Sequence, residues 1–154
     1  MSDEPPIQPG AALGVLGAGQ LGRMFAAAAV RMGYRVHVFA PDAGGSPAAA
    51  HAERVVTAPW QDEPALRDFA SGVSAVTLEF ENVPSSALDV VAERSPVRPG
   101  RWALHVAQNR GREKAFLERL GVPVAPWRRV ESPAEAADAA RALGGPARLK
   151  TAGF

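Results

Sequence analysis

Near its start the chain carries the stretch Leu13-Gly14-Val15-Leu16-Gly17-Ala18-Gly19-Gln20-Leu21-Gly22, in which an apolar run leads into closely spaced glycines. Residues 11–16 are apolar and short, which is typical of a strand buried on both faces of a parallel sheet. From Gln20 to Met32 apolar residues recur at helical spacing, and Gly33 follows where helices commonly end on glycine. The stretch therefore predicts a strand, a glycine turn and a helix, which together open a Rossmann-like unit.

The alternation of strands and helices continues along the chain. Further strands are predicted over residues 35–39, 54–57 and 75–80, with helices over 63–71 and 85–93. In the strand 35–39 we expect Val36 and Val38 to face inward and His37 outward. The pattern predicts an α/β fold with a Rossmann-like parallel sheet and helices on both of its faces.

Proline and glycine mark a change of organisation at Pro96-Val97-Arg98-Pro99-Gly100. We expect a flexible tail over residues 1–10, a Rossmann-like domain over 11–100, and a connector with the beginning of a second domain over 101–154. In this last part the pattern predicts two short helices, or one bent near Gly111, between 101 and 120. It also predicts strands over 127–130 and 147–151, and a helix over 135–143 with Ser132 as its N-cap.

Composition narrows the possible functions. Seventeen basic side chains balance sixteen acidic ones, for a formal net charge of +1, and no long run of one sign suggests a nucleic-acid or membrane-surface partner. The absence of cysteine excludes disulfides, thiolate catalysis and cysteine zinc sites, and the three histidines show no metal-ligand spacing. No apolar run approaches the roughly 20 residues of a membrane helix. A cytoplasmic protein is expected.

The glycine turn is the main candidate for ligand binding. Gly17 is expected to make the tight turn, Gly19 to let backbone amides approach an anion, and Gly22 to let the helix pack closely. A phosphate would then lie at the helix N-terminus. A nicotinamide dinucleotide is the alternative, with Asp42 on its ribose, although Asp42 lies in a loop and fits only loosely.

Charged residues near predicted strand ends supply further candidates. Glu79 and Glu81 lie two positions apart at the end of the predicted strand 75–80, so we expect both on one side and Phe80 on the other. The two carboxylates could hold ribose hydroxyls, an amine or a metal. A solvated acidic turn is the alternative. Arg110 lies on a basic helix face, and Lys150 ends an apolar strand, where an ammonium group calls for a partner such as phosphate.

Several motifs together resemble one family, the N5-carboxyaminoimidazole ribonucleotide synthetases, which are ATP-grasp ligases of purine synthesis. The glycine stretch extended to Arg23-Met24 resembles their opening signature. The others are Thr77-Leu78-Glu79-Phe80-Glu81-Asn82-Val83-Pro84, Val97-Arg98-Pro99-Gly100, Gln108-Asn109-Arg110-Gly111-Arg112-Glu113-Lys114 with Leu120-Gly121-Val122-Pro123-Val124-Ala125-Pro126, and Leu149-Lys150-Thr151. The resemblance runs from about residue 11 to the end of the chain, and it identifies the sheet domain as a pre-ATP-grasp domain.

The resemblance implies an activity. ATP and bicarbonate would form carboxyphosphate, which carboxylates the exocyclic amine of aminoimidazole ribonucleotide, with Mg²⁺ on the nucleotide phosphates. It implies that Gly19, Gln20, Leu21 and Glu79 contact the ribonucleotide and that Arg110 and Lys150 contact the ATP phosphates. It also implies a homodimer.

Family members are much longer than this chain. The magnesium ligands, most of the adenine pocket and the bicarbonate site are therefore expected beyond residue 154, and the chain by itself is expected to be inactive. The remaining alternatives are the NAD(P)-binding oxidoreductase domain and a non-catalytic interaction module.

Overall fold

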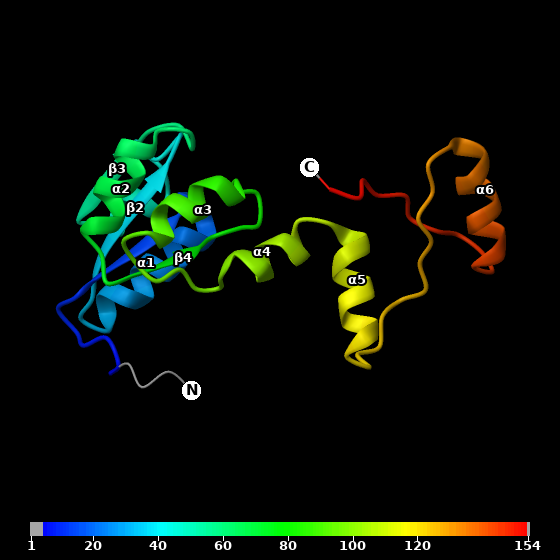
Figure 1. Ribbon diagram of the computed structural model, residues 1–154, viewed down its shortest axis with the longest axis horizontal. Coiled ribbons are helices and arrows are strands. Elements are labelled where there is room, and N and C mark those ends of the chain that lie inside the picture. The colour runs from blue at the N-terminus through cyan, green and yellow to red at the C-terminus, as the bar shows by residue number, and fades with distance from the viewer. Residues whose placement is uncertain (1–4, 154) are drawn as a thin grey trace. The chain divides into compact units, whose positions relative to one another are not determined.

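The computed structural model describes residues 5–153 (Figure 1). The elements follow one another as β1 Ala12–Leu16, α1 Gln20–Arg31, β2 Arg35–Ala40, the 3₁₀ helix η1 Ala48–His51, β3 Arg54–Thr57, α2 Glu63–Ser71, β4 Ala75–Leu78, α3 Ser85–Ala92, α4 Arg101–Ala107, α5 Arg110–Arg119 and α6 Pro133–Ala142. Strands and helices alternate through α3, which confirms the predicted α/β fold.

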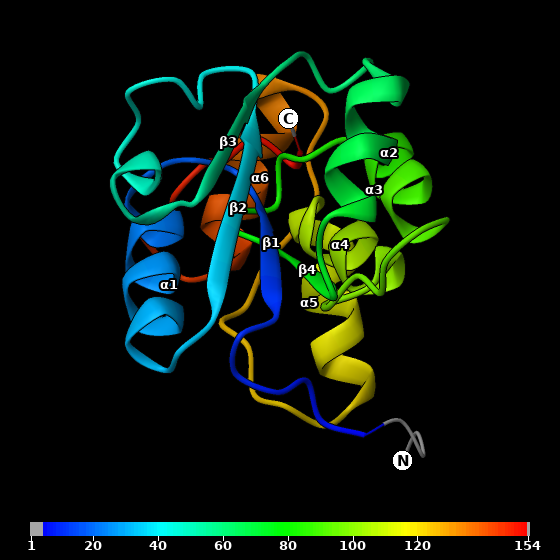
Figure 2. The same ribbon diagram turned by 90° about the vertical axis from the view of Figure 1, so that its left-hand side faces the viewer.

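The four strands form one parallel sheet in the order β3-β2-β1-β4. Leu16, the last residue of β1, pairs with Phe39 on one side and Leu78 on the other, so these three strands end at one edge. Figure 2 shows the sheet between α1 on one face and α2 with α3 on the other. The sheet therefore brings the segments that follow β1, β2 and β4 together.

Each face of the sheet packs on its own apolar core. Val15, Val36 and Val38 pack with small residues of α1 on one face. Leu16 and Phe39 pack with Phe69 and other buried residues from α2 and α3 on the opposite face. Because small side chains such as Ala26 and Ala29 let α1 lie close to the strands, the glycine turn before α1 is held firmly against the sheet.

Two expectations within the sheet are wrong. His37 does not face outward but is buried, with 6% of its surface exposed. Alternation along a strand separates inside from outside only when one face of the sheet meets water, and here helices cover both. The predicted strand 75–80 ends at Leu78, because Glu79 and Phe80 bend away from the ladder.

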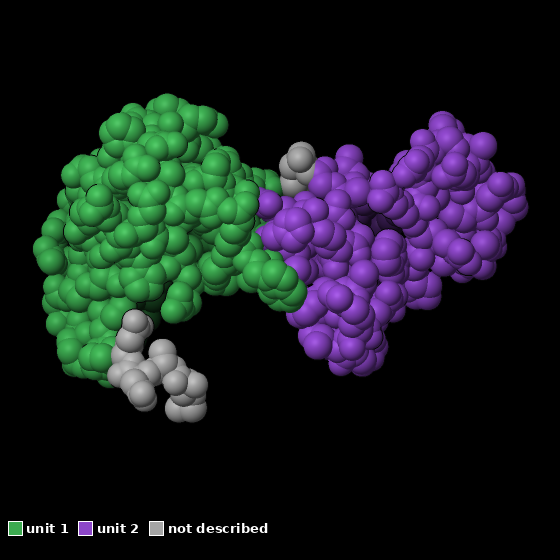
Figure 3. Space-filling view, viewed as in Figure 1, with its two compact units in different colours: residues 1–104 green, residues 105–154 purple. Residues whose placement is uncertain are grey.

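The described chain divides into two compact units, residues 1–104 and 105–154 (Figure 3). The division falls within α4, whose Leu104 is buried in the core of the first unit at 2% exposure. The expected connector began at residue 101, so the first turn of that segment belongs with the sheet domain. No helix among residues 5–153 is long and apolar enough to cross a membrane.

The second unit is built from α5 and α6 with extended segments around them. Two helices separated at Gln108 and Asn109 confirm the two-helix alternative for residues 101–120. Ser132 caps α6 as predicted, its hydroxyl accepting from the Glu135 amide at 3.2 Å. The strands predicted at 127–130 and 147–151 are wrong. Within residues 105–153 the only β pairing is the isolated bridge between Asn109 and Gly153. A strand requires a paired neighbour, which an apolar segment cannot supply alone.

Candidate functional site

The carboxyl edge of the sheet carries a hollow of about 580 Å³ in the first unit. We call it the strand-end hollow, because its lining comes from the segments just after the strands. Its lining residues are Gly17, Ala18 and Gly19 after β1, Ala40, Pro41 and Asp42 at the end of β2, Trp60 after β3, and Glu79 and Phe80 after β4. Open α/β sheets commonly bind ligands at this edge.

The carboxylate of Glu79 lies inside the glycine turn. The Gly19 amide donates to Glu79 Oε2 at 2.6 Å, a short bond typical of an ionised acceptor. The Glu79 backbone amide donates to Leu16 O at 3.0 Å, and the Gly17 amide donates to Phe39 O at 2.9 Å. The turn is therefore tied to β2 through its backbone and to β4 through a side chain.

The three glycines make room for this carboxylate. A Cβ on Gly17 would stand 2.7 Å from Glu79 Cβ, and Gly17 has a φ of 114°, which confirms its role in the tight turn. A Cβ on Gly19 would collide with Glu79 Oε1, and one on Gly22 would stand 3.0 Å from Oε2. Gly19 was expected to face a bound anion, but here the anion is a side chain of the protein.

Of the other residues predicted to contact a ligand, some line the strand-end hollow and some do not. Asp42 and Glu79 line the strand-end hollow, whereas Gln20 and Leu21 are exposed in the first turn of α1 and are not among its described lining residues. Phe80 lines the hollow beside Glu79 and lies near the Gly17 turn, so the expectation that it points away is wrong. The alternation stopped because β4 ends before both residues.

Trp60 and Phe80 add aromatic surface that the sequence analysis did not assign. Trp60 is half-buried, packs against both apolar cores and lies 5.5 Å from Phe39 between ring centroids. Its ring is therefore held by packing on one side while Trp60 also lines the hollow. The signal was available, because Trp60 follows β3 much as Asp42 follows β2.

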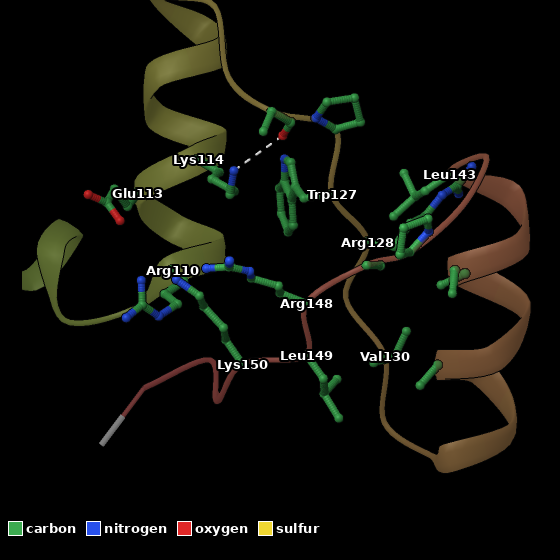
Figure 4. Close-up of a pocket in the computed structure, with 17 residues that line it drawn as sticks. Arg110, Glu113, Lys114, Trp127, Arg128, Val130, Leu143, Arg148, Leu149 and Lys150 are labelled. Atoms are coloured by element: carbon green, nitrogen blue, oxygen red, sulfur yellow. Dashed lines mark hydrogen bonds between the residues drawn. The ribbon is translucent and has the colours of Figure 1, made fainter.

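A second cavity, of about 530 Å³, lies within the second unit (Figure 4). Its charged lining consists of one acid, Glu113, and five cations: Arg110, Lys114, Arg128, Arg148 and Lys150. We call it the cationic cavity. The predicted residues Arg110 and Lys150 both line it, although they are 40 positions apart in the sequence.

Three of these cations converge. Figure 4 shows Arg110, Arg148 and Lys150 reaching toward one another from α5 and from the segment after α6. None of the three forms an ion pair within the described residues 105–153, whereas Lys114 Nζ donates to Ala125 O at 3.2 Å. Clustered cations that form no ion pair with a carboxylate suit a polyanion such as a phosphate chain. Arg148 was not anticipated, although its spacing from Lys150 in an extended segment could have indicated it.

Residues 11–108 match the ribonucleotide synthetase preATP-grasp domain. The chain belongs to this family. Its preATP-grasp domain thus comprises the whole sheet, the strand-end hollow and α4.

Two curated relatives of the preATP-grasp chain share one name. The N5-carboxyaminoimidazole ribonucleotide synthase of Brucella melitensis biotype 1 is 44% identical over 148 residues, which cover 96% of this chain and 41% of that protein. The enzyme of the same name from Bacillus subtilis is 38% identical over 145 residues, covering 94% and 38%. The chain thus spans about two fifths of the length of these relatives.

Solved structures agree with this assignment. An ADP complex of N5-carboxyaminoimidazole ribonucleotide synthetase has a TM-score of 0.81 and 36% identity, covering 91% of this chain and 37% of that one. The Aspergillus clavatus synthase in complex with ADP and 5-aminoimidazole ribonucleotide has a TM-score of 0.71 and 32% identity, covering 88% and 36%. The resemblance drawn from the motifs is confirmed, and the dinucleotide-binding alternative is not favoured.

Proposed function

We propose that the chain forms the ribonucleotide-binding domain, and the beginning of the ATP-binding domain, of an ATP-dependent carboxylating ligase. The full enzyme would convert aminoimidazole ribonucleotide, bicarbonate and ATP to N5-carboxyaminoimidazole ribonucleotide through carboxyphosphate. The relatives that share this preATP-grasp domain support the proposal. The chain alone would bind ligands without turnover.

The observation that carries the proposal is the strand-end hollow, whose lining includes Glu79. Glu79 and Asp42 offer acceptors to the hydroxyls or amine of a ribonucleotide, and Trp60 with Phe80 offers apolar walls. Gly19 holds Glu79 in place. Gln20 and Leu21 would add contacts from the exposed first turn of α1, next to the hollow's Gly19.

The cationic cavity supports the ATP side of the proposal. Arg110 and Lys150 would neutralise phosphate oxygens while carboxyphosphate forms, since clustered cations stabilise charge that spreads over a transferring phosphoryl group. Mg²⁺ would supply further charge on those phosphates. Within residues 5–153 no group of three or more histidine or acidic side chains could hold a metal ion.

The proposal extends to the location and partners of the enzyme. We propose a cytoplasmic enzyme, in keeping with a chain that contains no cysteine. A homodimer is proposed from the resemblance alone, and no nucleic-acid or membrane partner is proposed.

Isothermal titration of the chain with aminoimidazole ribonucleotide and with NADH tests the ligand class. We expect saturable binding of the ribonucleotide and none of NADH. Saturable NADH binding that is abolished in Asp42→Ala would refute the proposal in favour of an oxidoreductase domain. A folded chain that binds neither ligand would indicate an interaction module.

Steady-state kinetics of an enzyme of the relatives' full length, carrying this domain, test the two sites separately. Glu79→Ala is expected to raise KM for the ribonucleotide more than KM for ATP, and Lys150→Ala is expected to do the reverse. The two variants serve as controls for each other. Equal effects of both variants on both constants would contradict the assignment.

A further inference from the structure

The backbone amides at the start of α5 are bonded within the protein. A helix leaves its first amides without partners inside the helix, and a capping side chain, water or a ligand commonly takes them. Asn109 Oδ1 accepts from the Gly111 amide at 3.1 Å and from the Arg112 amide at 3.0 Å. The Asn109 amide itself donates to Val106 O at 3.4 Å. Three of the first four amides are thus bonded close by in the sequence.

The remaining amide joins α5 to the end of the described chain. The Arg110 amide donates to Ala152 O at 2.8 Å, and Asn109 forms an antiparallel bridge with Gly153. Asn109 can act both as cap and as bridge because its backbone is extended, with a φ of −138° and a ψ of 116°. We call the contacts of Asn109 and Arg110 with Ala152 and Gly153 the α5 clasp.

The α5 clasp fixes the segment that carries Lys150. An extended chain advances at most about 3.3–3.6 Å per residue, so the Cα of Lys150 lies within about 7 Å of that of Ala152. Arg110 is the first residue of α5, so the clasp joins the chain segments of two residues that line the cationic cavity. The charges of Arg110, Arg148 and Lys150 repel one another. Their convergence in Figure 4 therefore depends on backbone contacts such as the clasp.

We propose that Asn109 is a positioning residue for ATP, which holds Lys150 beside Arg110 through the α5 clasp. Asn109 is not among the described residues that line the cationic cavity. Its effect on the phosphates therefore passes through its neighbours and not through a contact of its own. The inference rests on the proposed function and makes the ATP side of it more specific.

Steady-state kinetics of an enzyme of the relatives' full length, carrying this domain, test the inference. Asn109→Ala leaves the amides of Gly111 and Arg112 without their acceptor, so the first turn of α5 should fray and release the Lys150 segment. We expect KM for ATP to rise about fivefold, with KM for the ribonucleotide unchanged. Asn109→Ser keeps an oxygen at the cap and adds no charge, so it should restore KM for ATP to within about twofold.

Ser132→Ala is the matched control, because it removes the cap of another helix in the same unit. The Ser132 hydroxyl accepts from the Glu135 amide at the start of α6. Within the described residues Ser132 forms no hydrogen bond with residues 148–153. The control should therefore lower the stability of the second unit much as Asn109→Ala does, yet leave KM for ATP within about twofold.

Hydrogen exchange of the Arg110 amide follows the clasp directly. In the whole chain, NMR should show this amide protected, because it donates to Ala152 O. Asn109→Ala should speed its exchange by about fivefold or more, and Asn109→Ser should not. The measurement involves no ligand, so it does not depend on the proposed function.

The outcomes separate the inference from the proposed function. If Asn109→Ala speeds exchange at Arg110 but leaves KM for ATP unchanged, the inference is overturned while the proposed function stands. The same holds if Ser132→Ala raises KM for ATP as much as Asn109→Ala does, or if the Arg110 amide is unprotected in the unaltered chain. If the unaltered full-length enzyme does not consume ATP, both are overturned.

Discussion

Adding one methyl group at Gly19 tests how the turn holds Glu79. In Gly19→Ala the new Cβ would collide with Glu79 Oε1, and the only ready escape is for the carboxylate to swing away from the Gly19 amide. The hydrogen bond lost, with a charged acceptor, contributes about 1.5–3 kcal/mol. Alanine also lowers the conformational entropy of the unfolded chain, which stabilises the fold by about 0.4–1 kcal/mol. We therefore expect a net loss of about 1–2 kcal/mol in the free energy of unfolding.

Urea unfolding of a small set of variants measures this loss and identifies its cause. Gly44→Ala is the matched control, because its Cβ would meet only Thr57 Oγ1 at 3.4 Å, an ordinary contact. In a Glu79→Ala background both the obstacle and the hydrogen bond are gone, so Gly19→Ala should stabilise the fold by about 0.4–1 kcal/mol, which gives a coupling of about 1.5–3 kcal/mol in the double-mutant cycle. Equal costs of Gly19→Ala with and without Glu79 would refute the reasoning.

Two further predictions concern charge. The pKa of His37 lies below its ordinary value of 6.5, chiefly because burial disfavours the imidazolium and despite the opposing charge of Glu53. The unfolded chain therefore takes up a proton first as pH falls, so urea unfolding should show stability declining between about pH 7 and pH 5, with a flatter profile in His37→Gln. For the cationic cavity, Arg148→Ala should weaken ATP binding about fivefold in isothermal titration, whereas Arg129→Ala, whose guanidinium pairs with Glu131 at 2.9 Å, should not. A pH profile of stability that is unchanged in His37→Gln would contradict the first prediction. Equal effects of Arg148→Ala and Arg129→Ala on ATP binding would contradict the second.

Local signals in the sequence predicted local structure well. The apolar runs of the first unit, the glycine after α1 and Ser132 before α6 each act within a few residues, so they determine where elements begin and end. The strands predicted at 127–130 and 147–151 failed because a strand depends on a partner elsewhere in the chain. The burial of His37 was missed for a similar reason, since helices distant in sequence cover that face of the sheet.

The candidate site was predicted only in part, and the reason is again distance along the chain. Asp42 and Glu79 could be found because they follow predicted strands, and that rule, applied to β3, would also have found Trp60. That Glu79 enters the turn could not be found, because Gly19 and Glu79 are 60 positions apart and meet only through the pairing of β1 with β4.

The sequence of a glycine turn between a strand and a helix therefore does not by itself show which acceptor the turn binds. The glycines permit an acceptor to approach the backbone amide, and the acceptor can be a ligand phosphate or a carboxylate of the protein. The neighbouring strand decides between them: if an acidic residue follows its last paired position, as Glu79 follows Leu78, the carboxylate reaches the amide first. The turn then carries a protein carboxylate at the carboxyl edge of the sheet, beside the amide that faces a phosphate in dinucleotide-binding turns.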